Sequence, residues 1–95
     1  MDLKIRRRFA KENDVTLFRG DCLKLLKKIP TGTARLIITS PPYNIGKAYE
    51  KRQPLSDYLA FQKEVIKECI RTLRKDGSIC WQVVQYVIRK GQVLY

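Results

Sequence analysis

The sequence contains no histidine, and its three cysteines, Cys22, Cys69 and Cys80, form no C-x-x-C pair. Because the cysteines are also odd in number, neither a disulfide framework nor a metal site is indicated, and a reducing cytoplasm is the expected location. No stretch approaches the length needed to span a membrane. No apolar segment follows the N-terminal arginines, as it would in a secretory signal. We therefore expect a soluble cytoplasmic protein that holds no metal.

Glycine is scarce as well, and its distribution argues against one large class of nucleotide enzymes. The five glycines, Gly20, Gly32, Gly46, Gly77 and Gly91, do not form the G-x-x-x-x-G-K-[S/T] loop whose backbone cradles phosphates. They form no G-x-G pattern either. An enzyme built on a phosphate-binding loop is therefore disfavoured.

Positive charge, in contrast, is abundant. The chain has 20 Lys and Arg against 9 Asp and Glu, which gives a net charge of +11. A surface of this charge attracts polyanions, so nucleic acid is the leading partner class, although solvated lysines alone would give the same count. The densest run, Arg6-Arg7-Arg8, lies within residues 1–14, which we treat as a basic N-terminal arm. The arm is either a disordered segment that contacts phosphates or an ordinary tail.

Hydrophobic periodicity in residues 15–95 predicts alternating strands and helices. Strands are predicted over residues 15–19, 35–39 and 78–84, and helices over 22–28 and 57–75. The order β-α-β-α-β predicts an α/β fold whose three parallel strands form half of a doubly wound sheet. The third strand is apolar on nearly both sides, so helices are expected on both faces of the sheet.

The ends of the two helices are predicted from their flanking residues. Asp21 and Ser56 are the expected N-terminal caps, and Asp76-Gly77 is the expected end of the longer helix. At 95 residues the chain can form only a thin core. One apolar stripe of the longer helix is expected to supply much of it, namely Tyr58, Phe61, Val65, Ile66, Cys69, Ile70 and Leu73.

The most distinctive stretch is Thr39-Ser40-Pro41-Pro42-Tyr43-Asn44, which follows the apolar run Leu36-Ile37-Ile38. Proline fixes φ and has no N–H, so two prolines form a stiff corner that presents carbonyl oxygens without competing donors. Ser40 adds an acceptor and Tyr43 an aromatic face, a set that suits a flat group bearing an NH2. The plainer alternative is that the prolines end the strand, Ser40 caps a turn and Tyr43 packs on the core.

This stretch closely resembles the [D/N/S]-P-P-[Y/F/W] motif of amino-group DNA methyltransferases, which methylate adenine N6 or cytosine N4. Gly20-Asp21-Cys22 is similar to a G-D segment that helps hold S-adenosylmethionine in this family, although a helix cap alone also explains Asp21. The resemblance implies the Rossmann-like, doubly wound sheet of a class I methyltransferase, here truncated and covering residues 15–95. It further implies DNA as the substrate, a place in a restriction-modification system, catalytic roles for Ser40, Pro41, Pro42 and Tyr43, and cofactor contacts from Asp21 and Cys22.

The mechanism implied by the resemblance depends on hydrogen-bond acceptors. Ser40 Oγ and the Pro41 carbonyl would hold both N–H bonds of the target amino group, while the base leaves the duplex and stacks on Tyr43. Serine at this position occurs in cytosine-N4 and in some adenine-N6 members, and the continuation Asn44-Ile45-Gly46-Lys47 favours adenine. Carbon-5 methylation is disfavoured because no cysteine has the sequence context of a nucleophile.

The chain also departs from the family pattern. The glycine-rich F-x-G-x-G loop for the methionine end of the cofactor is missing. The sequence resembles the beginning of a permuted class in which the Pro-Pro motif comes first, and we expect a fragment, a truncated gene product or one part of a split enzyme. Such a part would associate with a complementary chain or a second copy. The alternative is a non-catalytic basic remnant that binds nucleic acid through charge and binds no cofactor.

Overall fold

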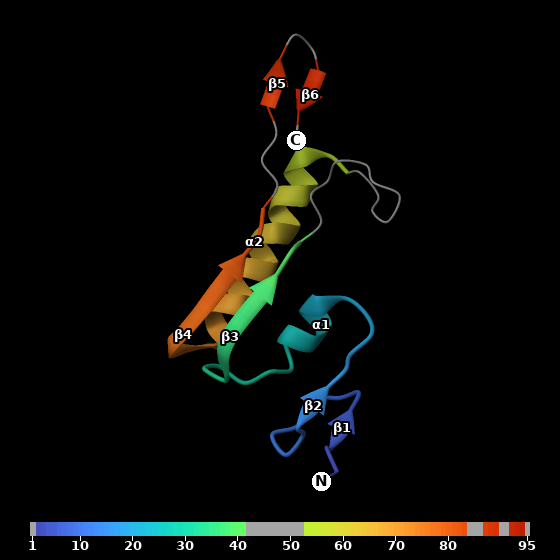
Figure 1. Ribbon diagram of the computed structural model, residues 1–95, viewed down its shortest axis with the longest axis vertical. Coiled ribbons are helices and arrows are strands. Elements are labelled where there is room, and N and C mark those ends of the chain that lie inside the picture. The colour runs from blue at the N-terminus through green and yellow to red at the C-terminus, as the bar shows by residue number, and fades with distance from the viewer. Residues whose placement is uncertain (1, 42–52, 84–86, 90–91, 95) are drawn as a thin grey trace.

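The computed structural model of the chain describes residues 2–41, 53–83, 87–89 and 92–94. These residues form two helices and six strands of an α/β protein (Figure 1). Neither described helix combines the length and the apolar character needed to cross a membrane. The elements in chain order are β1 (Ile5–Arg6), β2 (Val15–Thr16), α1 (Cys22–Leu26), β3 (Ala34–Thr39), α2 (Leu55–Thr72), β4 (Leu73–Trp81), β5 (Val87–Arg89) and β6 (Gln92–Leu94).

The central unit is a β-α-β motif made of β3, α2 and β4. The two strands pair in parallel, with Leu36 opposite Ser78 and Thr39 opposite Trp81. Parallel neighbours need a long crossover, and α2 supplies it by running back along the strand pair (Figure 1). The carboxyl ends of β3 and β4 therefore lie side by side.

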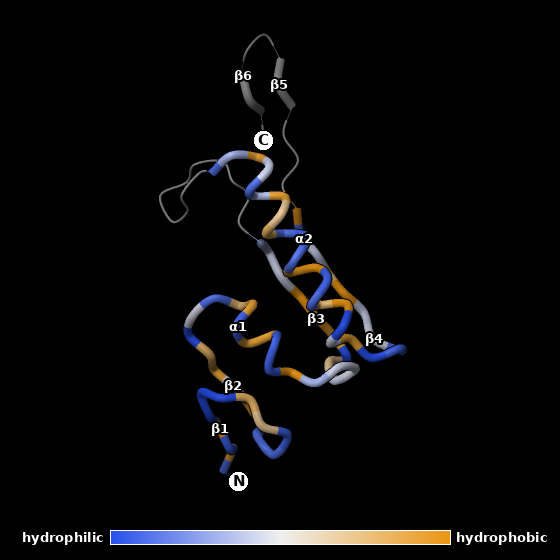
Figure 2. Tube along the Cα trace, turned by 180° about the vertical axis from the view of Figure 1, so that it is seen from behind, coloured by the Kyte–Doolittle hydropathy of each residue, from blue (hydrophilic) through white to orange (hydrophobic). Residues whose placement is uncertain are grey.

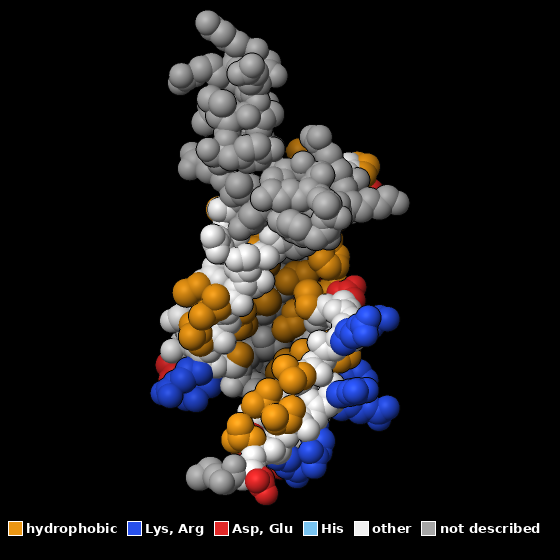
Figure 3. All heavy atoms as spheres, turned by 45° about the vertical axis from the view of Figure 1, so that its right-hand side comes forward, with side chains coloured by type: hydrophobic (Ala, Val, Ile, Leu, Met, Phe, Trp, Pro, Cys, Tyr) orange, Lys and Arg blue, Asp and Glu red, His pale blue; other side chains and the backbone are white. Residues whose placement is uncertain are grey.

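One face of this strand pair is covered and the other is open. Leu36 and Ile38 of β3 are 56% and 71% exposed. The partners opposite them, Ser78 and Cys80, are exposed as well. The alternate side chains are half-buried on the side of α2, namely Ile37, Thr39, Ile79 and Trp81. The prediction of helices on both faces is wrong for the described residues, and large apolar side chains remain at the surface (Figure 3).

The apolar core is small. Val65 and Cys69 of α2 are its buried apolar residues among those described, and Gln62 and Thr72 of the same helix are buried as well. These four lie on one face of the helix, because a spacing of three or four residues repeats about once per turn. Apolar and polar residues consequently alternate along α2 (Figure 2). The predicted stripe was too wide, since Ile66 and Ile70 are exposed, Tyr58 and Phe61 are half-buried, and Leu73 belongs to β4.

Both ends of α2 differ from the prediction. The helix starts at Leu55 after Pro54, and no side chain caps it, so Ser56 is not the cap. It ends at Thr72, before Asp76-Gly77, which lie inside β4. The physical reason is tertiary: the Gly32 and Thr33 N–H groups donate to the Arg71 and Thr72 carbonyls, at 3.0 and 2.8 Å. A distant turn thus satisfies carbonyls that a glycine cap would otherwise serve.

The first predicted strand is shorter than expected and lies in another sheet. Residues Val15–Thr16 form β2, which pairs in parallel with β1, and the predicted three-stranded sheet is therefore not formed. Asp14 supports the pairing because its Oδ2 accepts a hydrogen bond from the Lys4 N–H at 2.6 Å. Part of the basic arm, at Ile5–Arg6, is consequently a strand.

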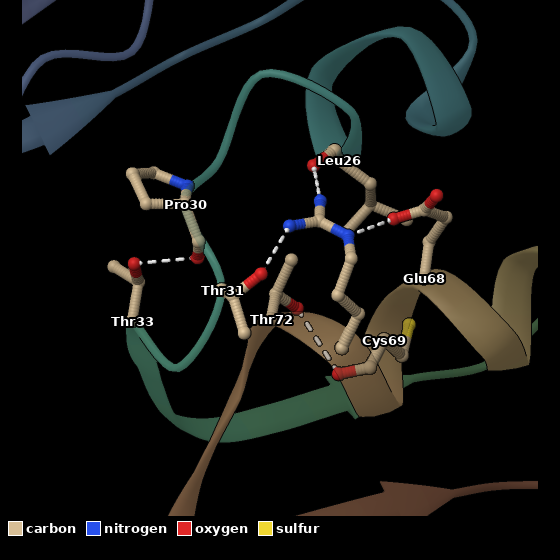
Figure 4. Close-up of polar contacts among 8 residues, drawn as sticks. Leu26, Pro30, Thr31, Thr33, Glu68, Cys69 and Thr72 are labelled. Atoms are coloured by element: carbon tan, nitrogen blue, oxygen red, sulfur yellow. Dashed lines mark hydrogen bonds and ion pairs between the residues drawn. The ribbon is translucent and has the colours of Figure 1, made fainter.

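Arg71 of α2 connects the N-terminal part of the chain to the β-α-β motif. Its Nη2 donates to the Leu26 carbonyl at 2.8 Å, and its Nη1 donates to Thr31 Oγ1 at 3.2 Å (Figure 4). Its Nε pairs with Glu68 one turn earlier on α2. The Leu26 carbonyl at the end of α1 also accepts the Ile29 N–H at 3.0 Å, so the Arg71 guanidinium is its second donor, and a cation is favourable at this end of a helix.

Candidate active site

Ser40 and Pro41 follow β3 directly, at the carboxyl edge of the parallel pair. Successive residues of a strand point to opposite faces. Ser40 continues the series of Leu36 and Ile38 on the open face and is exposed, whereas Pro41 continues the covered series and is buried. Ligands of open parallel sheets bind at this edge, beyond the carboxyl ends of the strands. The edge is therefore the candidate site.

A hydrogen bond fixes the Ser40 hydroxyl. Ser40 Oγ donates to Gln82 Oε1 at 2.8 Å, across the ends of the two strands. The Gln82 N–H donates to the Thr39 carbonyl at 3.0 Å, which extends the ladder one residue beyond β4. A serine hydroxyl has one proton and two lone pairs. Because the proton is used on Gln82, both lone pairs of Ser40 Oγ remain available to accept.

The remaining residues of the predicted corner are not part of the described structure. Pro42 and Tyr43 lie outside the described residues, so their predicted roles stay predictions. Within the described residues, Ser40 bonds with Gln82, which lies 42 positions further along the sequence. The bond is a tertiary contact that brings two strand ends together.

Asp21 is confirmed as the N-terminal cap of α1. Its Oδ1 accepts the Leu23 N–H at 2.9 Å, and its other carboxylate oxygen has no partner among the described residues. Gly20 before it has φ of +148°, and an added Cβ would lie 3.0 Å from the Phe18 ring. Glycine therefore suits this turn in both backbone conformation and space.

Cys22 opens α1 and is exposed at the surface. Partial desolvation of its thiol and, secondly, the charge of Asp21 raise the pKa of Cys22. Burial likewise raises the pKa of Cys69 on α2, and the neighbouring Cys22 adds to the effect. The start of α1 therefore lies close to Cys69.

The two predicted halves of the site are not joined in the way that the strand order suggested. β2 pairs with β1 and β3 pairs with β4, so Asp21 and Ser40 do not follow neighbouring strands of one sheet. No hydrogen bond within the described part of the chain links Asp21 to Ser40. Asp21 lies at the start of α1, which packs on α2, whereas Ser40 follows β3, which pairs with β4.

Gln82 was not singled out from the sequence, where it reads as one residue of a strand. A signal was present: it is the first polar side chain after Ile79-Cys80-Trp81, at the end of a predicted parallel strand. Polar side chains at that edge are candidates for ligand contact.

Comparison with known proteins places the site in context. Residues 34–94 match the N6/N4 type of the family described as DNA methylase. The chain is 43% identical over 83 residues to the type II methyltransferase M.BglII of Bacillus subtilis, which covers 87% of this chain and 23% of that protein. It is 37% identical over 79 residues to the type II methyltransferase M.ScaI of Streptomyces caespitosus, covering 83% of this chain and 26% of that protein.

A third relative is a DNA adenine methyltransferase, YhdJ of Escherichia coli K12. The identity is 44% over 70 residues, which covers 67% of this chain and 23% of that protein. The chain thus spans about a quarter of the length of these relatives. No solved structure matches it.

Proposed function

The chain belongs to the N6/N4 DNA methylase family, and from that premise we propose that it supplies the target-amino site of a DNA methyltransferase. The proposed reaction transfers a methyl group from S-adenosylmethionine to the N6 amino group of a flipped adenine in DNA. The observation that carries the proposal is the hydrogen bond from Ser40 Oγ to Gln82 Oε1. It leaves an acceptor at the carboxyl edge of the parallel strands, where the family motif requires one.

The proposed role of the corner is to activate a poor nucleophile. The nitrogen lone pair of an exocyclic amino group is delocalised into the ring of the base. Ser40 Oγ and the Pro41 carbonyl would each accept one N–H, so the nitrogen can become pyramidal and its lone pair can point away from both acceptors. Tyr43 would stack on the flipped base and hold it in this geometry.

Ser40 is neutral, which limits what it contributes. A carboxylate at this position would offset positive charge developing on the nitrogen, and a hydroxyl cannot. The corner therefore acts mainly by positioning the amino group, and its contribution depends on how firmly the acceptors are held. Pro41 meets this requirement because it is buried and its φ is fixed by its ring.

Asp21 and Cys22 are the residues that would hold the cofactor. S-adenosylmethionine supplies an electrophilic methyl group on a sulfonium. The unpartnered carboxylate oxygen of Asp21 can accept a hydrogen bond from the adenosine end, and Cys22 lies beside it at the start of α1. The chain fits that end only, because its 95 residues contain no G-x-G loop for the methionine end.

Adenine is the proposed target base. The Asn44-Ile45-Gly46-Lys47 continuation favours it, and a relative at 44% identity is named as a DNA adenine methyltransferase. Cytosine N4 is the alternative, since the amino group is presented in the same way in both bases.

In the proposed architecture, residues 15–95 are the N-terminal portion of a methyltransferase catalytic domain, in which the parallel β3–β4 pair belongs to a doubly wound, Rossmann-like sheet. Residues 1–14 form a basic arm that contacts DNA phosphates. The exposed face with Leu36 and Ile38 supports association with further sheet-covering structure, either a complementary chain or a second copy. The relatives' names as type II methyltransferases support a role in restriction-modification, and the cytoplasm is the proposed location.

The first test measures cofactor binding without requiring turnover. The purified chain is titrated with S-adenosylmethionine in a calorimeter, and iodoacetamide labelling of Cys22 is followed by mass spectrometry with and without the cofactor. We expect heat of binding and slower labelling of Cys22. Asp21→Asn should abolish both effects while keeping the helix cap, since asparagine caps as well as aspartate. Asp57→Asn is the matched control, the same change in the first turn of α2.

The second test separates catalysis from DNA binding. Ser40→Ala should lower methyl transfer to adenine-containing DNA far more than it lowers DNA affinity, because the hydroxyl acts on the amino group and phosphate contacts dominate affinity. A folded parent that binds DNA but shows neither cofactor binding nor Cys22 protection would instead support the non-catalytic module that binds nucleic acid through its net charge of +11.

A further inference from the structure

We infer that Gln82 is a positioning residue that sets the direction of the Ser40 hydroxyl, and so makes Ser40 an acceptor toward the amino group of the target base. The inference rests on the proposed function, because it assigns a second residue to the same amino site. It starts from one contact, Ser40 Oγ to Gln82 Oε1 at 2.8 Å, with Ser40 as the donor.

The hydroxyl of serine can either donate or accept, and a base amino group requires an acceptor. A hydroxyl that is free to rotate presents its proton toward the amino group part of the time, which opposes binding. In the structure Gln82 turns Oε1 rather than its NH2 toward Ser40, and because an amide oxygen can only accept, the hydroxyl proton is directed to Gln82. With the proton committed to Gln82, the lone pairs of Ser40 Oγ point away from β4.

The backbone holds Gln82 where this contact requires it. Thr39 lies opposite Trp81 in the parallel register, so Ser40 and Gln82 are the next pair along the strands. The Gln82 N–H donates to the Thr39 carbonyl at 3.0 Å and keeps that register past the end of β4. Both side chains fall on the open face, where a flat ligand can approach them, while Pro41 falls on the covered face.

A purely structural role makes a different prediction. If the bond only ties two strand ends together, any residue that bonds to Ser40 would serve, whichever partner donates. If the bond sets direction, the polarity matters: an acceptor at position 82 preserves recognition of the amino group, and a donor at position 82 destroys it.

The experiment uses two single-stranded thymidine oligonucleotides, one with a single central adenine and one with a central purine base that lacks the amino group. Affinities of the 95-residue chain are measured by fluorescence anisotropy at one salt concentration, and the adenine-to-purine ratio is the readout. Phosphate contacts are the same for both oligonucleotides and cancel in the ratio. One neutral hydrogen bond gives a preference of roughly two- to tenfold for adenine.

Three variants at position 82 test the polarity. Gln82→Glu keeps an acceptor and should retain the parent's ratio. Gln82→Lys keeps a hydrogen bond but reverses it, and Gln82→Met removes it, so both should bring the ratio close to one. Val83→Met is the matched control, because it adds the same side chain one position further on, at a site that is 68% exposed. Circular dichroism melting checks that each variant is folded.

The outcomes separate the inference from the function on which it depends. A parent ratio of one overturns the proposed amino site and the inference with it. A parent preference that Gln82→Lys and Gln82→Met both retain overturns the inference alone. A ratio kept by Gln82→Lys and lost in Gln82→Met shows a structural tie, which also overturns it. In a Ser40→Ala background the position 82 variants should have no further effect on the ratio.

Discussion

Arg71→Met should destabilise the fold strongly, although Arg71 lies far from the candidate active site. The substitution keeps an unbranched apolar stem and removes the guanidinium. It breaks the bonds to the Leu26 carbonyl and Thr31 Oγ1 and the pair with Glu68. Because these partners lie in α1, in the turn after it and in α2, the loss separates elements that are 40 and 45 residues apart in sequence.

The expected magnitude follows from the geometry and the exposure. A hydrogen bond to a charged group contributes about 1.5–3 kcal/mol when it is protected, whereas an exposed ion pair contributes about 0–1 kcal/mol. The Arg71 side chain is 32% exposed, which places it between these limits. We expect a loss of about 2–3 kcal/mol in the free energy of unfolding for the three contacts together. For a domain of this size the loss corresponds to a fall of about 10–20 °C in Tm.

The assay is urea unfolding followed by circular dichroism, with amide hydrogen exchange at Gly32 and Thr33 as a local readout. Arg74→Met is the matched control: Arg74 pairs with Asp76, both side chains are about half exposed, and the change should cost less than about 0.5 kcal/mol. Equal losses in the two variants would refute the reasoning. So would faster exchange at Gly32 and Thr33 in the Arg74 variant than in the Arg71 variant.

Three further predictions concern single residues. Asp21→Ala should cost about 1 kcal/mol through loss of the α1 cap and Asp21→Asn much less, measured by urea unfolding; equal losses would contradict the capping role. The rate of alkylation of Cys22 should rise with pH, with a midpoint above that of an unhindered thiol, because desolvation raises the pKa of Cys22 and the thiolate is the reactive form. A midpoint below the ordinary thiol range would contradict this. Cys69 should be labelled last, because it is buried. Gly77→Ala should lower Tm more than Gly32→Ala, because a Cβ at Gly77 would meet a side chain at 2.8 Å and a carbonyl oxygen at 3.0 Å. A Cβ at Gly32 would enter open space, so the only cost there is the backbone strain of alanine at a φ of +70°. The reverse order of Tm values would contradict this account of the packing.

Features that depend on near neighbours could be predicted from the sequence. The cap of α1 at Asp21 bonds only two residues along the chain, and the strand before Ser40 follows from a short, branched apolar run. The long helix follows from its period, although its stripe was drawn too wide. The Pro-Pro motif was sufficient to identify the family, because its residues are contiguous in the sequence and need no tertiary contact to be recognised.

Features that depend on distant partners could not be predicted in this way. Asp76-Gly77 has the residues of a helix end, yet α2 ends earlier because Gly32 and Thr33 take its last carbonyls. β2 has the composition of a strand in the main sheet, yet it pairs with β1. Two-sided burial of the sheet was expected from composition, and the described residues cover one face only.

The sequence by itself determined which residue types stand at the corner and which family they indicate. Only the tertiary structure decided how Ser40 is oriented, because its partner Gln82 is 42 residues away and meets it through the register of two parallel strands. Composition and periodicity describe one segment at a time, whereas a hydrogen bond between strand ends depends on how two segments are paired.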